Sequence, residues 1–213
     1  MSASPFALRP SALLLSIDSA TDRPTLAIGA PGRSIDERVI PQRHDLSRDI
    51  DSAARALLEA HGGSESLGGV LVADGPGSFT GLRIGIAFAK GVVGALRIPL
   101  FAAPSMMGAA LGVAHGPTVV EYDALRGDVY RAVYHFTADA VRTIQAPQVV
   151  PSSPPADPGF ARAFADRASA AALLGLMGLP GGVEPVEHPG AWQPSYGRLA
   201  EAEARRLARH AGA

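Results

Sequence analysis

The stretch GPGSFTGLRIG, from Gly75 to Gly85, decides how the centre of this chain folds. The apolar run Val70–Ala73 before it predicts a buried strand, and residues 81–94 after it predict a helix. A glycine-rich turn between a strand and a helix N-terminus directs backbone N–H groups into one concavity, where a phosphate or carboxylate can bind.

Two interpretations of this turn stay open from the sequence. It does not match a Walker loop, because no Gly-Lys-Ser/Thr closes it, and Thr80 stands where a dinucleotide fingerprint has its third glycine. The first interpretation is therefore a structural turn, in which the glycines allow the required backbone conformation. The alternative is an anion or nucleotide site made by Gly75, Gly77, Ser78, Thr80, Gly81 and Arg83.

Composition limits the classes of function. With 213 residues and 47% hydrophobic content, the chain can bury a core as one domain or two small lobes. A net charge of −1 argues against a protein that binds nucleic acid by itself. The absence of cysteine excludes disulfides, thiolate nucleophiles and zinc–thiolate sites. Residues 1–11 are followed by too few apolar residues for a signal peptide or a membrane span, so we expect a cytoplasmic protein without a membrane partner.

The first half of the sequence predicts three strands joined by tight turns, and therefore an antiparallel meander, ahead of the alternating helices and strands. The expected strands cover residues 13–18, 25–29, 34–40, 69–73 and 99–102, and the expected helices cover residues 45–61, 81–94 and 104–114. Either Asp45 or Ser47 can cap the first helix.

The second half begins as the first does, with an apolar strand that ends in aspartate. Asp18 and Asp123 occupy equivalent points of two strand–Asp–turn–strand units, which indicates two lobes of similar origin. We expect a tail at residues 1–12, a first lobe at 13–115 and a smaller lobe at 116–213. The second lobe should contain strands at 118–123 and 128–136, a linker at 147–158, and helices at 160–177 and 196–210.

The string from Gly75 to Gly85 resembles the signature of the TsaB (YeaZ) family. Residues 13–21, His44–Ser47 and Asp123–Tyr130 are similar to further parts of that family, and Pro194–Arg198 is similar to its closing motif, with Gly197 in place of a leucine. The resemblance implies an α/β chain with the two-lobed actin/Hsp70-like (ribonuclease H-like) fold, in which mixed sheets are flanked by helices and the second lobe is reduced.

The resemblance also implies a function. Members of the TsaB family are non-catalytic subunits that activate a TsaD-type catalytic partner, which transfers a threonylcarbamoyl group to the adenosine next to the anticodon of tRNA. A TsaE-type ATPase takes part, and tRNA is reached only through the complex. The family implies a homodimer when the chain is alone, no cofactor, and nucleotide binding only in the assembled complex.

The helix expected at 81–94 is apolar almost all round, so it must be covered on more than one side. One face carries Leu82, Ile86, Ala89 and Val93, and a second carries Ile84, Phe88 and Val92. A buried core helix is one interpretation. The resemblance favours the other, a contact with a homologous subunit in which the first face joins Ile50, Ala54 and Leu57 of the preceding helix.

The rival function is a small ATPase or kinase of the same superfamily that uses the Gly75–Gly81 turn and Asp18. In superfamily members that hydrolyse ATP, such an aspartate helps to hold magnesium, but Ala20 stands where they have a glycine. We expect no metal site, because no two of the six histidines have helical ligand spacing, and His44 is more simply a capping or solvated residue. Arg198, Arg205, Arg206 and Arg209 could touch RNA, although a solvated helix face is the simpler interpretation.

Overall fold

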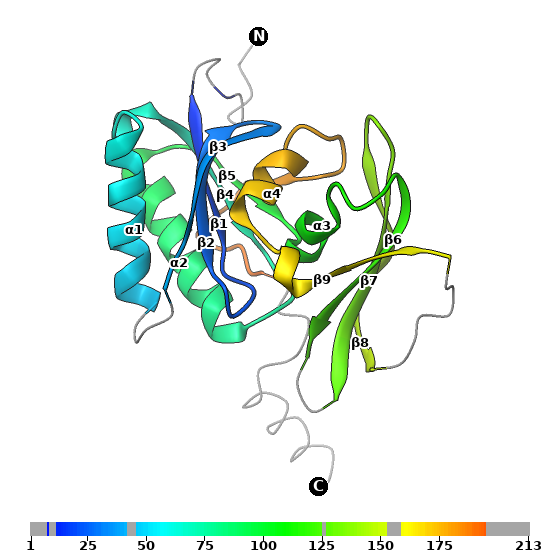
Figure 1. Cartoon of the computed structure of the whole chain (residues 1–213). Coiled ribbons are helices and arrows are strands. Elements are labelled where there is room, and N and C mark those ends of the chain that lie inside the picture. The colour runs from blue at the N-terminus through cyan, green and yellow to red at the C-terminus, as the bar shows by residue number, and fades with distance from the viewer. Residues whose placement is uncertain (1–7, 9–11, 42–45, 125–126, 153–158, 195–213) are drawn as a thin grey trace, which may run out of the picture.

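The structure, a computed structural model, describes Leu8 and residues 12–41, 46–124, 127–152 and 159–194. These residues form two β-sheets with helices on one side of the first sheet and between the two sheets (Figure 1). The architecture is the mixed α/β arrangement that the sequence predicts.

The first sheet has six strands in the order β10-β5-β4-β1-β2-β3. Its strands are β1 (Leu13–Asp18), β2 (Thr25–Ala30), β3 (Arg33–Val39), β4 (Leu67–Ala73), β5 (Leu100–Ala103) and β10 (Glu184–Pro185). Strands β1, β2 and β3 pair antiparallel, which confirms the predicted meander, whereas β4 pairs parallel with both β1 and β5. Parallel strands are normally covered on both faces, and β4 is buried along its whole length.

The second sheet has four strands in the order β8-β7-β6-β9. They are β6 (Gly116–Asp123), β7 (Asp128–Phe136), β8 (Val141–Pro151) and β9 (Ala161–Phe164). Glu121 on β6 accepts hydrogen bonds from Arg131 on β7, at 2.7 Å, and from Arg162 on β9, at 2.5 Å. This carboxylate therefore ties three neighbouring strands together.

Four helices complete the described fold. Helices α1 (Leu46–Ala60) and α2 (Phe79–Leu96) lie on one side of the first sheet, and α3 (Ser105–Ala110) and α4 (Ala170–Leu176) lie between the two sheets (Figure 1). Helix α2 begins at Phe79 because the Ser78 side chain caps it by accepting the N–H of Gly81 at 3.2 Å.

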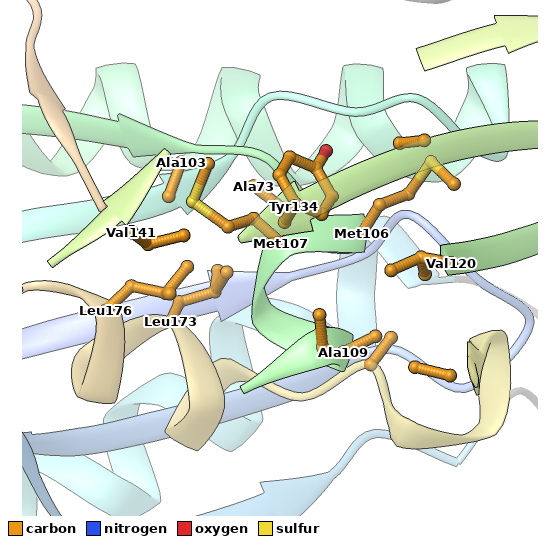
Figure 2. Close-up of a cluster of buried hydrophobic side chains, with 14 of the residues drawn as sticks. Ala73, Ala103, Met106, Met107, Ala109, Val120, Tyr134, Val141, Leu173 and Leu176 are labelled. Atoms are coloured by element: carbon orange, nitrogen blue, oxygen red, sulfur yellow. The ribbon is translucent and has the colours of Figure 1, made fainter. Parts of the chain in front are cut away.

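Two hydrophobic cores follow from these layers. One fills the space between the first sheet and the pair α1 and α2. The other lies between the sheets and includes Met106, Met107, Tyr134, Leu173 and Leu176 (Figure 2). The second core joins the two halves of the chain over a wide apolar contact.

The structure corrects three sequence predictions, two of them in the second half. The helix expected at 160–177 is strand β9, a short 3₁₀ turn (Ala165–Arg167) and then α4. The linker expected at 147–158 begins inside β8, since Pro147 and Pro151 are tolerated on an edge strand. The helix expected at 104–114 ends at Ala110.

Two elements that follow residue 116 in the sequence contact the first sheet. Strand β10 pairs with β5 and so completes the first sheet. Helix α4 is fastened to that sheet through its first turn: the N–H of Ala170 donates to Thr25 Oγ1 at 2.8 Å, and the N–H of Ala171 donates to Glu37 Oε1 at 2.9 Å. The C-terminal part of the described chain therefore returns to the first lobe. The expected tail falls almost entirely outside the described residues, as does the expected helix at 196–210.

Candidate functional site

The glycines of the turn before α2 are required by close packing against the turn between β1 and β2. The N–H of Ser78 donates to the Ala20 carbonyl at 2.7 Å. A Cβ at Gly77 would overlap that same carbonyl, and a Cβ at Gly81 would overlap the carbonyl of Ser19. Gly85, one turn later, faces the Ser19 hydroxyl equally closely. The glycine spacing is thus explained by two backbone segments that touch.

The same contacts limit the turn as an anion cradle. The Ser78 N–H is taken by Ala20, and the Gly81 N–H is taken by the Ser78 hydroxyl. Of the six residues predicted for an anion site, Gly75 and Gly81 are buried and Gly77 is half-buried, whereas Ser78, Thr80 and Arg83 are exposed. The Arg83 guanidinium lies over the Phe79 ring, 5.4 Å from its centroid. The exposed part of the turn is consequently a mixed polar and aromatic rim.

Asp18 lies at the end of β1 and is fully enclosed. Its Oδ1 accepts the N–H of Ala20 at 3.0 Å, and its Oδ2 accepts the hydroxyl of Ser105 at 2.7 Å. Ser105 in turn lies 3.0 Å from the hydroxyl of Tyr122 on β6. Burial raises the pKa of Asp18, and these two hydrogen bonds only partly offset the effect.

This network makes Asp18 a link between the two sheets, because it joins β1 through α3 to β6. Both of its carboxylate oxygens already have a partner. Asp123, its counterpart in the second half, is exposed. The strand–Asp–turn–strand repeat therefore does not place two equivalent carboxylates in one cleft.

The seven residues predicted for a subunit interface are buried within this chain. Their exposed fractions run from 0 to 5%, and all of them belong to the core between the first sheet and its two helices: Ile50, Ala54, Leu57, Leu82, Ile86, Ala89 and Val93. The i, i+4, i+7, i+11 stripe of α2 packs on the sheet and α1. These seven side chains therefore leave almost no exposed surface in the folded chain.

The second apolar face of α2 is the one that stays uncovered. Phe79 is 37% exposed, Ala87 is exposed, and Ile84, Phe88 and Val92 are half-buried. A hollow of about 480 Å³ lies along this face, lined by Ser47, Ile50, Phe79, Thr80, Arg83, Ile84, Ala87 and Phe88. The sequence prediction missed Phe79 and Ala87, although the almost complete lack of charge around α2 was the signal for a second apolar face.

Two glycines on α2 have no packing partner among the residues that the structure describes. A Cβ at Gly91 or at Gly94 would meet no atom within 4 Å, and both residues are exposed. Glycine inside a helix costs about 1 kcal/mol relative to alanine. By length and composition α2 could also cross a membrane, but 33% of it is buried, and it packs against β4 and α1 as a core helix does.

Comparison with known proteins places the chain in a family. The model of the family TsaD, tRNA N6-adenosine threonylcarbamoyltransferase, matches residues 39–152. A protein of Bacillus subtilis called tRNA threonylcarbamoyladenosine biosynthesis protein TsaB is 35% identical over 101 residues, which are 46% of this chain and 40% of that protein. The structure of YeaZ from Pseudomonas aeruginosa superposes with a TM-score of 0.59 and 26% identity, covering 69% of this chain and 71% of that one. This chain belongs to the TsaB (YeaZ) family.

Other relatives match a larger share of the chain and are called uncharacterized. An uncharacterized protein of Mycobacterium tuberculosis is 34% identical over 205 residues, which cover 89% of this chain and 93% of that protein. An uncharacterized protein of Mycobacterium leprae is 37% identical over 170 residues, but these span only 45% of its length. The TsaB-family assignment and the YeaZ likeness confirm the actin/Hsp70-like fold that the sequence predicted.

Some predicted site residues lie outside the described part of the chain. His44 is one, and the arginines of the C-terminal segment (Arg198, Arg205, Arg206 and Arg209) are the others. Among the described residues, no three His, Asp or Glu side chains gather closely enough to hold a metal ion.

Proposed function

We propose that this chain is a non-catalytic subunit that binds a TsaD-type partner through the outer face of α2. In this way it would support the synthesis of threonylcarbamoyladenosine on tRNA. The names of two relatives support a role in this process: the proteins of Bacillus subtilis and Escherichia coli are both called tRNA threonylcarbamoyladenosine biosynthesis protein TsaB. The observation that carries the proposal is the uncovered apolar face of α2 with its hollow of about 480 Å³.

The physical argument rests on what a partner would gain from this face. Covering the exposed rings and aliphatic groups of α2 removes apolar surface from water, which is the main driving force of association. Gly91 and Gly94 leave room for a second backbone to approach the helix, and none of the described residues uses that room. Polar groups also line the hollow: Ser47 of α1 and Thr80 and Arg83 of α2. An apolar centre with a polar rim is the usual anatomy of a protein interface.

A homologous partner fits this surface by symmetry. The chain itself matches the TsaD family model, so a TsaD-type protein would present an equivalent helix pair. Two equivalent helix pairs can meet about a pseudo-two-fold axis, as in an isologous dimer. The same geometry permits a homodimer when the partner is absent. A TsaE-type ATPase and the tRNA would then join the assembled complex, and nucleotide would bind only there.

The test uses one charge in the hollow and one outside it. Ala87 is exposed in the isolated chain and lines the hollow, so Ala87→Glu should fold normally. In the complex the new carboxylate would be buried without a partner, which costs several kcal/mol and should weaken binding by about 100-fold or more. Ala56→Glu is the matched control, because Ala56 is exposed on α1 and does not line the hollow.

Binding is measured by calorimetry with the TsaD-type protein of the same cell, and folding by circular dichroism. A second measurement records threonylcarbamoylation of tRNA by the reconstituted subunits. If Ala87→Glu binds as tightly as the wild type, the contact lies elsewhere. Magnesium-dependent ATP hydrolysis by the purified chain alone, abolished by Asp18→Ala, would instead favour the ATPase or kinase function.

A further inference from the structure

A second hollow, of about 330 Å³, lies where the chain returns to the edge of the first sheet. Asp74, which follows β4, forms one wall, and Glu184 in β10 forms another. Glu187, His188 and Trp192 also line it. It is separate from the groove on α2 and from the Asp18 network.

Asp74 is the unusual group in this hollow. Its carboxyl is largely buried, and burial together with the negative charge of Glu184 raises its pKa to about 7. Its own backbone N–H only partly offsets this. The nearby hydroxyl of Tyr134 on β7 is buried and has no hydrogen-bond partner within the described residues, and the charge of Asp74 contributes to raising the pKa of Tyr134. Neither Glu184 nor Tyr134 can neutralise an ionised Asp74.

Residues 184–192, which we call the latch segment, are held to the rest of the described chain by few hydrogen bonds. Their apolar anchors are Val186, which is 5% exposed in the core beside α2, and Trp192, which packs against that core. Strand β10 contains only two residues, which pair with Phe101 and Ala102 of β5. The N–H of Val186 donates to the Leu100 carbonyl at 2.9 Å. At the far end, the ammonium group of Lys90 on α2 donates a hydrogen bond to the Trp192 carbonyl at 2.7 Å. The same group lies 5.7 Å from the centroid of the Trp192 ring.

We propose that the latch segment is a proton-controlled element: it stays closed on the first sheet while Asp74 is protonated, and it opens when Asp74 and Glu184 are both ionised. Two carboxylates that line the same hollow repel each other, and Glu184 lies on a strand of only two residues. Opening separates the charges and returns Asp74 to water. It also releases Lys90, which links the latch segment to the helix whose outer face is uncovered.

The sign of the pH dependence follows from proton linkage. In the closed state Asp74 keeps its proton up to about pH 7, whereas an ordinary aspartate loses it near 3.8. The closed state therefore binds more protons, and rising pH favours the open state. The opening constant should increase about tenfold for each pH unit between about pH 4 and pH 7 and should then level off.

The experiment measures amide hydrogen exchange of Val186 between pH 5 and pH 8 by NMR, corrected for the intrinsic pH dependence of exchange and compared with an amide in β1. We expect the protection factor of Val186 to fall about tenfold per pH unit up to about pH 7, while the amide in β1 stays more protected at every pH. Trp192 is the only tryptophan of the chain, so its emission reports the same opening independently.

Three variants distinguish the effect of Asp74 from the effects of the groups around it. Asp74→Asn should remove the pH slope and keep Val186 protected. Glu187→Gln is the matched control for loss of a carboxylate, and His188→Gln is the control for histidine titration. Both should keep the slope. The proposal is overturned if the wild type shows no slope, if Asp74→Asn retains it, if His188→Gln abolishes it, or if Val186 exchanges no faster than the amide in β1.

Discussion

Replacing Gly91 by alanine should stabilise this chain alone and weaken its binding to a partner. In the isolated chain a Cβ at this position meets no atom within 4 Å, and the residue lies well inside α2, on its exposed side. Alanine is favoured over glycine in a helix interior by about 0.8 to 1 kcal/mol. No packing cost opposes this gain, so the free energy of unfolding should rise by about 1 kcal/mol, and the Tm by roughly 2 to 4 °C.

Gly81→Ala is the matched comparison, since it makes the same substitution in the same helix. There the added Cβ would overlap the backbone carbonyl of Ser19, which cannot move without shifting the turn between β1 and β2. Overpacking of this kind costs about 1 to 3 kcal/mol, which exceeds the gain in helix propensity. The two variants should therefore change stability in opposite directions.

The assay is urea denaturation followed by far-UV circular dichroism, with calorimetric titration of the TsaD-type partner as the second readout. Gly91→Ala should show a higher midpoint together with affinity about tenfold lower or worse, because 1.4 kcal/mol of steric conflict corresponds to a factor of ten. Unchanged affinity would show that no partner backbone approaches Gly91. A lower midpoint for Gly91→Ala, or an unchanged one for Gly81→Ala, would refute the packing argument itself.

Three further changes test the interior of the chain. Ala89→Glu places a carboxylate in the core under α2 and should lower the free energy of unfolding by several kcal/mol. Circular dichroism should then show loss of the cooperative transition. A folded variant with normal stability would contradict the burial of this face. Ser105→Ala leaves Asp18 and the Tyr122 hydroxyl without their shared partner and should lower the free energy of unfolding by about 1 to 3 kcal/mol; a neutral result would mean that this network does not join the sheets. Asp74→Asn should raise the free energy of unfolding by up to about 4 kcal/mol at pH 8 and by little at pH 4. The reason is that the pKa of Asp74 is raised to about 7 in the folded state, so the wild-type protein loses stability as the pH rises. Equal curves of unfolding free energy against pH for the wild type and the variant would rule this out.

The first half of the fold was accessible from local sequence signals. The antiparallel meander follows from three predicted strands joined by short turns, and α1 follows from an amphipathic pattern that ends before Gly62 and Gly63. The glycine-rich stretch carried the family signature as a string of letters. Its physical reason, the close approach of Ser19 and Ala20, involves residues almost sixty positions earlier, so no local pattern could reveal it.

The second half shows why local signals fail. Residues 161–164 have the short apolar character of either a helix or a strand, and they become β9 only because β6 offers a parallel edge. Likewise β10 has two residues and exists because β5 has a free edge. The strand propensity of such short segments is decided by the neighbour that pairs with them.

The sequence by itself determined the fold class, the family and the presence of a helix with two apolar faces. Hydrophobic periodicity indicates that α2 has two apolar faces, but it does not indicate which of the two faces packs against the sheet. Only the tertiary structure decided that Leu82, Ile86, Ala89 and Val93 face inward and that Phe79, Ala87 and Phe88 are left to the outer side. The deciding contact is the fit of Gly81 and Gly85 against the turn at Ser19, which sets the rotation of the helix about its axis and thereby chooses its exposed face.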